Sequence, residues 1–241
     1  MKSSFLKNSS VSISLKIWFA LIDYLIVTKI ILDTLLPNAF ADIAQAALFG
    51  WVPLGVFAII GLIGVVLSQK TGFPDVWEGK RPFNQNILFP ILTGFGIGVL
   101  MVSIDLFTGF TKLIAARHGV SQQYTDFPSM FFIFISAAIV VEVVYRLFLI
   151  PFLLWIISNV ILKNKAQTYI FWTLAVLTSL LEPLGQYPDL QVVPGYLSIL
   201  LGLIYFSINL TQAGFFRKYG FLAAIMVRIG FYFVWHVLYV H

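Results

Sequence analysis

Long apolar segments alternate with short polar loops along the whole chain, a pattern that predicts a series of membrane-spanning helices. The apolar segments cover about 15–36, 46–68, 87–110, 129–162, 168–182, 194–211 and 221–241. About 20 apolar residues in a helix cross the hydrocarbon core of a bilayer. We therefore predict an all-α fold, a polytopic transmembrane bundle of about seven spans, with residues 1–241 forming a single integral membrane domain.

The fourth apolar segment is too long for one straight crossing. A helix over 129–162 would extend about 50 Å at 1.5 Å per residue, whereas the hydrocarbon core is about 30 Å thick. Pro151 lies inside this segment, and proline kinks or interrupts a helix because it lacks an amide hydrogen. We expect one crossing from Ser129 to about Leu149, followed by a short or kinked helix to Leu162.

The composition excludes a water-soluble globule. Hydrophobic residues make up 60% of the chain and charged residues only 10%, too few to cover a soluble protein of this size. The absence of cysteine excludes disulfides, thiolate catalysis and thiolate metal sites. The net charge of +5 comes from basic residues in short loops, so it indicates membrane orientation and no nucleic-acid partner.

The basic residues also predict the orientation. With seven crossings and a cytoplasmic N-terminus, Lys112 and Arg117 fall outside. The cytoplasmic set is then Lys2, Lys7, Lys16, Lys70, Lys80, Arg81, Lys163, Lys165, Arg217 and Lys218. Because cytoplasmic loops carry the excess of lysine and arginine, we expect a multi-pass protein of the plasma membrane with its N-terminus in the cytoplasm.

Three local features of the first half have simple structural interpretations. Lys29 and Asp33 are four residues apart and are expected to pair on one helix face. The sequence GFGIG at 94–98 offers small residues that let a neighbouring helix approach closely. Asp105 lies near the end of its span, where we expect water to hydrate it.

The sequence VEVVYR at 141–146 contains the first candidate for function. Glu142 and Arg146 are four residues apart, so both lie on one face of a helix in hydrophobic sequence. A charge at the bilayer centre costs about 2.5–3.5 kcal/mol on insertion scales, so such residues face protein or trapped water. The pair is either part of a functional site or an internal salt bridge that joins helices.

A second polar group lies in the last two fifths of the chain. The final helix carries Arg228, Tyr232 and His236 at intervals of four, which predicts one inward-facing polar stripe. Glu182 precedes Pro183 and is expected near a helix end.

With the VEVVYR pair, this group supplies the minimum for a membrane-embedded hydrolase. The catalytic candidates are Glu142, Arg146, Glu182 and His236, with Arg228 and Tyr232 as substrate or oxyanion ligands. The same residue types also serve a proton or ion pathway. The spacing of Glu142, Glu182 and His236 does not support a zinc site, so we expect no metal and no cofactor.

The order of these features resembles the CAAX-protease and bacteriocin-processing family of intramembrane glutamic endopeptidases. VEVVYR stands where the family has EExxxR, LLEPLG at 180–185 stands near its FxxxH motif, and GFFRKYGFLAAIMVR at 214–228 is similar to its last motif. The resemblance covers about 125–235 and implies an all-helical bundle with catalytic groups in a membrane cavity. It implies that Glu142 belongs to the water-activating pair and that Arg146 organises it.

The sequence departs from the family at several motif positions. Val141 occupies the first glutamate position, Leu147 replaces the glycine that follows the arginine, and Arg228 stands where the final motif has histidine. No histidine follows Leu181 at the FxxxH spacing.

Two hypotheses follow. One is a divergent intramembrane endopeptidase in which Glu142 activates water to cleave a membrane-associated peptide. The other is a catalytically inactive family member that acts as a membrane binding or scaffold protein. A transporter is a third alternative, although the chain is short for two inverted repeats. The expected partners are membrane lipid and a membrane-associated peptide or protein.

Overall fold

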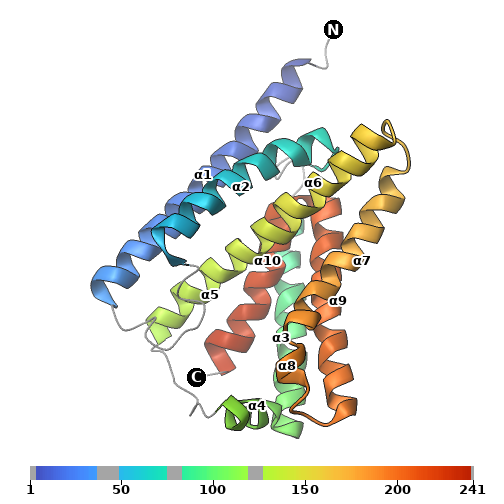
Figure 1. The fold of residues 1–241 in the computed structure, drawn as a ribbon. Helices are drawn as coiled ribbons and strands as arrows, with labels where there is room; N and C mark the ends of the chain where they lie inside the picture. Colours follow the sequence, from blue (N-terminus) through green and yellow to red (C-terminus); the bar gives the residue numbers. More distant parts are fainter. Residues whose placement is uncertain (1–3, 37–48, 75–82, 119–126, 240–241) are drawn as a thin grey trace.

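The computed structural model describes residues 4–36, 49–74, 83–118 and 127–239, and within these ranges the chain is helical and contains no strand. The long helices form an elongated bundle (Figure 1). The loop that carries Lys80 and Arg81, and residues 1–3 with Lys2, lie outside the described residues. The all-α prediction is confirmed for the described part of the chain.

The helices have the following bounds, with α for α-helix and η for π-helix. They are α1 Ser4–Leu35, α2 Trp51–Lys70, η2 Asn84–Leu88, α3 Phe89–Thr108, α4 Phe110–His118, α5 Phe127–Glu142, η3 Val143–Leu149, α6 Ile150–Leu154, η4 Trp155–Ile161, α7 Gln167–Gly185, α8 Tyr187–Leu190, α9 Gly195–Tyr219, α10 Phe221–Tyr232 and η5 Phe233–Tyr239.

Six helical stretches within the described residues are long and apolar enough to cross a membrane. They are Trp51–Lys70, Asn84–Thr108, Ser129–Ile161, Gln167–Gly185, Gly195–Tyr219 and Phe221–Tyr239. Helix α1, with 32 residues, is also long but is not one of the six. It carries Lys16, Asp23, Lys29 and Asp33, and the last two form the predicted ion pair.

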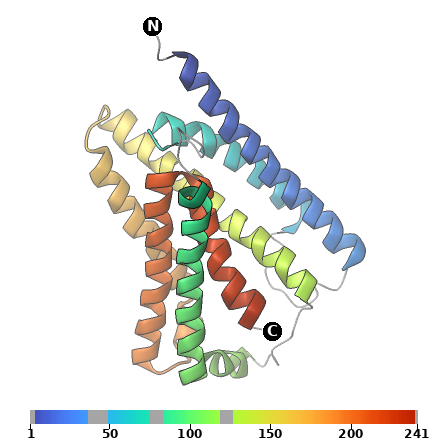
Figure 2. The same cartoon turned by 180° about the vertical axis from the view of Figure 1, so that it is seen from behind.

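Successive long helices run in opposite directions along the bundle. The start of α1, the end of α2, the α6–α7 turn and the α9–α10 turn lie at one end (Figure 1). The α3–α4 turn and the C-terminus lie toward the other end, as Figure 2 shows from behind. The alternation is the one expected for a multi-pass membrane protein.

The stretch from Ser129 to Ile161 passes through Pro151 as one continuous helix of 33 residues. Of the two forms expected after Leu149, a separate helix or a kinked continuation, the separate helix is not seen, and π-helical turns η3 and η4 flank the proline. Proline conflicts with an α-helical carbonyl four residues before it. In η3 the amide of Ile150 instead donates to Tyr145 O, five residues back, so the wider turn accommodates the proline.

Glycines allow α3 and α10 to cross at very short distance. A Cβ at Gly94 would collide with the carbonyl oxygen of Val227, and one at Gly230 would collide with that of Ile91. Gly96 faces open space instead. The predicted close approach of a neighbouring helix to the GFGIG segment is therefore confirmed. Gly94 lies against the backbone of Val227, and Gly98 lies against the side chain of Val234.

Helix α10 is the most enclosed helix of the bundle. It packs against α3, α9 and α5, and nearly all of its residues are buried. On the other side of α5, helix α2 lies against η3, where a Cβ at Gly64 would be 2.5 Å from Leu147 O. These contacts fix the register of the helices that carry the candidate residues.

Three local predictions differ from the structure. The segment expected as a loop before the last helix continues α9 to Tyr219, and the turn is reduced to Gly220, whose φ of 90° favours glycine. Part of the polar loop after the third span forms α4. Asp105 is 4% exposed, and its carboxylate accepts hydrogen bonds from Thr111 N (2.9 Å) and Tyr239 OH (3.0 Å).

Candidate functional site

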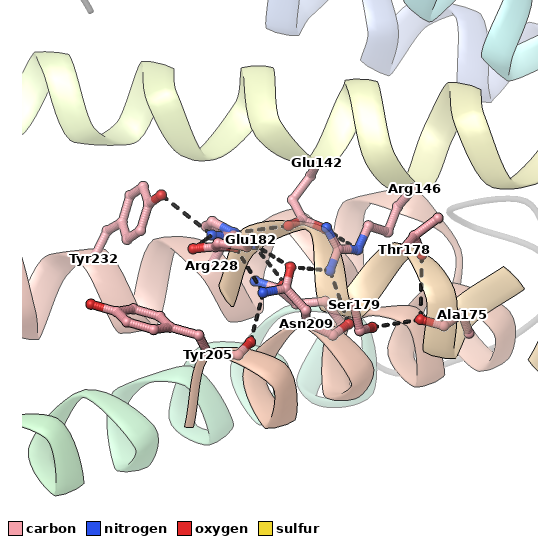
Figure 3. A network of polar contacts seen from close by, with 11 residues as sticks. Glu142, Arg146, Ala175, Thr178, Ser179, Glu182, Tyr205, Asn209, Arg228 and Tyr232 are labelled. Atoms are coloured by element: carbon pink, nitrogen blue, oxygen red, sulfur yellow. Dashed lines mark hydrogen bonds and ion pairs between the residues drawn. The ribbon is translucent and has the colours of Figure 1, made fainter. Parts of the chain in front are cut away.

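Four helical segments bring the two predicted glutamates and two predicted arginines together inside the bundle. Glu142 ends α5, Arg146 lies in η3, Glu182 lies in α7 and Arg228 lies in α10 (Figure 3). Glu142, Arg146 and Arg228 are at most 1% exposed, and the Glu182 side chain is 18% exposed. The sequence thus predicted residues that the fold places in one network, although they are up to 86 positions apart.

The Arg228 guanidinium lies between the two carboxylates. Its Nε donates to Glu142 Oε1 at 2.9 Å. Its two Nη atoms donate to the two oxygens of Glu182, Nη1 to Oε1 at 3.1 Å and Nη2 to Oε2 at 2.9 Å. This bidentate arrangement is the strong form of an arginine–carboxylate contact.

Arg146 forms the third ion pair of the network, after the two that Arg228 forms with Glu142 and Glu182. Its Nε lies 3.6 Å from Glu142 Oε2, an ion-pair distance that is too long for a hydrogen bond. Its Nη2 donates to the backbone oxygen of Asn209 at 3.0 Å and also to Asn209 Oδ1. Two carboxylates and two guanidinium groups give a formal charge of zero, which a low-dielectric interior strongly favours over a net charge.

Three residues of α9 belong to the network and were not predicted. Asn209 Oδ1 accepts from Arg228 at 2.9 Å, and its Nδ2 donates to Glu182 Oε2 and to Tyr205 O, each at 2.7 Å. Gln212 Oε1 accepts from Arg228 at 2.9 Å. The sequence did contain an indication of Asn209 and Gln212, because two amide side chains three residues apart in an apolar span must face a polar partner.

The predicted stripe on the last helix divides between two environments. Tyr232 joins the polar network, where its hydroxyl accepts from Arg228 Nη1 at 3.3 Å. His236 stacks on Phe134 with ring centres 4.0 Å apart and nearly parallel, and it meets Tyr232 edge-on at 4.9 Å. His236 therefore lies in an aromatic layer beside the network, while Arg228 lies between the two carboxylates.

Hydroxyl groups near the network are held by backbone carbonyls. Ser179 donates to Ala175 O at 2.6 Å, and Thr178 donates to the same oxygen at 3.3 Å (Figure 3). Within the described part of the chain, neither hydroxyl is hydrogen-bonded to a histidine or carboxylate that would activate it as a nucleophile. Among the described residues, no group of three or more His, Cys, Asp or Glu side chains is arranged to hold a metal ion.

Comparison with known proteins adds no assignment. No protein-family model matches the chain, and neither a curated protein nor a solved structure gives a match.

Proposed function

We propose that the protein is a catalytically inactive relative of the intramembrane glutamic endopeptidases, acting as a membrane-embedded binding or scaffold protein. The observation that carries this proposal is the position of Arg228, whose guanidinium contacts Glu142 and both oxygens of Glu182. A hydrolase of this class needs a carboxylate that holds a water molecule next to the peptide. Here the cation occupies the space between the two carboxylates.

The electrostatics of the network also oppose general base catalysis. A general base must accept a proton during the reaction. Glu142 and Glu182 instead balance the charges of Arg146 and Arg228 in ion pairs. The same balance stabilises the packing of α5, α7, α9 and α10, the helices that contribute the network.

The departures from the family motifs support the same proposal. Val141 has no group that could activate water, and Arg228 replaces the histidine of the final motif. His236, which the sequence offered as a catalytic candidate, packs against the rings of Phe134 and Tyr232. The proposed partner is a membrane-associated peptide or protein that binds without being cleaved.

We also propose that the protein lies in the plasma membrane with a cytoplasmic N-terminus. The helices cross the bundle in alternating directions (Figures 1 and 2), so the loop charges fall at defined ends. Lys70, Lys163, Lys165, Arg217 and Lys218 then lie at the same end as the start of α1. This distribution agrees with the excess of basic residues in cytoplasmic loops.

The experiment is an assay of purified protein against a library of membrane-proximal peptides, scored for cleavage and for retention by cross-linking. Wild type, Glu142→Gln and the exposed control Asp23→Asn are compared. We expect retained and intact peptides with wild type and Asp23→Asn. Cleavage by wild type that Glu142→Gln lowers at least about 10²-fold, at unchanged thermal stability, would establish the endopeptidase instead. If wild type neither cleaves nor retains any peptide, the binding role is contradicted.

A further inference from the structure

One end of the bundle carries a cluster of exposed lysines on two segments that are distant in sequence. Lys70 is the last residue of α2, and Lys163 and Lys165 lie in the turn between η4 and α7. All three are exposed, and none forms an ion pair with a described residue. Neither segment contains an acidic residue, since α2 and the stretch 155–170 have no Asp or Glu.

Hydrogen bonds join the two lysine segments. Asn159 Nδ2 donates to Lys70 O at 3.3 Å, and Gln167 Nε2 donates to Thr71 O. The turn itself is closed by Ser158, whose hydroxyl donates to Lys165 O at 3.1 Å. The two segments therefore form one surface whose backbone is fixed by the fold.

The turn has an unusual backbone. Lys163, Asn164 and Ala166 have φ values of 51°, 66° and 56°, the left-handed region that side chains other than glycine and asparagine rarely adopt. Strained conformations of this kind persist where the surrounding structure holds them, and they gather at binding sites. Here the strain maintains a tight lysine-bearing turn at the end of two long apolar helices.

We propose that this lysine cluster, formed by Lys70, Lys163 and Lys165, binds the headgroup of an anionic phospholipid. The cluster directly follows exposed apolar residues of the membrane span, including Val160 and Ile161. An acyl chain therefore lies along the helix while the phosphate reaches the ammonium groups, and lysine stems extend along apolar surface to the headgroup level. Basic clusters between helices at one membrane face have this preference. The inference rests on the membrane-spanning fold and is independent of the proposed binding or scaffold role.

The test uses the full-length protein in nanodiscs of phosphatidylcholine with a minor fraction of phosphatidylglycerol. Retained lipid is counted by native mass spectrometry for wild type, Lys163→Gln/Lys165→Gln, and a control that removes the same charge at the other end, Lys112→Gln/Arg117→Gln. We expect wild type and the control to retain phosphatidylglycerol, and the test variant to lose roughly 25-fold in affinity, about five-fold per lysine.

Two further measurements complete the test. The single variant Lys70→Gln should lose about five-fold in affinity for phosphatidylglycerol, and it replaces the double variant if that variant does not fold. Equal loss in the test and control variants, or no selectivity over phosphatidylcholine, would overturn the proposal. Inorganic phosphate at millimolar concentration should not displace the lipid, and full displacement would show that the site binds free phosphate and also overturn it.

Discussion

Asn209 is hydrogen-bonded to three of the four charged side chains of the network, although it was not predicted from the sequence. Its carboxamide oxygen accepts from Arg146 and Arg228, and its amide donates to Glu182. Charged residues in an apolar span are conspicuous because of their insertion cost, and this made Glu142, Arg146, Glu182 and Arg228 predictable. The insertion cost of an asparagine is smaller, so Asn209 was overlooked. The pairing of each glutamate with a particular arginine depends on contacts between helices, which a local sequence pattern does not encode.

We predict that Asn209→Leu lowers the free energy of unfolding by about 1–3 kcal/mol, because donors of two buried arginines and an acceptor of Glu182 lose their partner. Ser207→Ala on the exposed face of the same helix should change it by less than about 0.5 kcal/mol. Denaturant unfolding in detergent, followed by tryptophan fluorescence, measures both. Equal stability of the two variants would show that Asn209 is not part of the network.

At the scale of helices, six of the seven predicted apolar segments correspond to helical stretches of the described chain that are long and apolar enough to cross a membrane, because length and hydropathy are local properties. The first, 15–36, lies mostly in α1, which is not one of the six. The ends were less predictable. Helix α9 extends through the basic residues Arg217 and Lys218, which were expected in a loop. The Arg217 guanidinium carbon lies 4.8 Å from the ring centre of Phe171, a contact that holds this side chain at the end of the apolar helix. The π-helical turns on both sides of Pro151 could not be predicted, because a proline alone does not determine whether a helix breaks, kinks or widens into a π-helical turn.

The contact between α3 and α10 gives a prediction at this scale. Gly94→Val should destabilise the bundle by about 1–3 kcal/mol or prevent folding, because its Cβ would overlap the backbone of Val227. Gly96→Val, two residues away and facing open space, is the matched control and should behave like wild type. Thermal midpoints by size-exclusion chromatography after heating distinguish the two. Similar midpoints would mean that the helices do not cross at Gly94.

At the scale of the whole molecule, the arrangement predicts where the C-terminus lies. If α1 and the six apolar stretches all cross, the termini are on opposite sides and the C-terminus is outside. A C-terminal reporter that is active only in the cytoplasm should therefore be silent, and the same reporter inserted after Lys163 should be active. An active C-terminal reporter would show that one span, most directly the charged α1, does not cross.

A double-mutant cycle on Glu182 and Arg228 measures whether Arg228 neutralises the glutamates of the site. Thermal and denaturant unfolding is measured for wild type, Glu182→Gln, Arg228→Gln and the double variant. Each single change leaves a buried charge unbalanced and should cost about 3–5 kcal/mol. The double variant keeps Glu142 paired with Arg146, so it should cost about 1–3 kcal/mol less than the sum of the two single changes, which is the coupling energy of residues in contact. Effects that add within about 0.5 kcal/mol would show that Glu182 and Arg228 do not form the ion pair from which the inactive role is inferred.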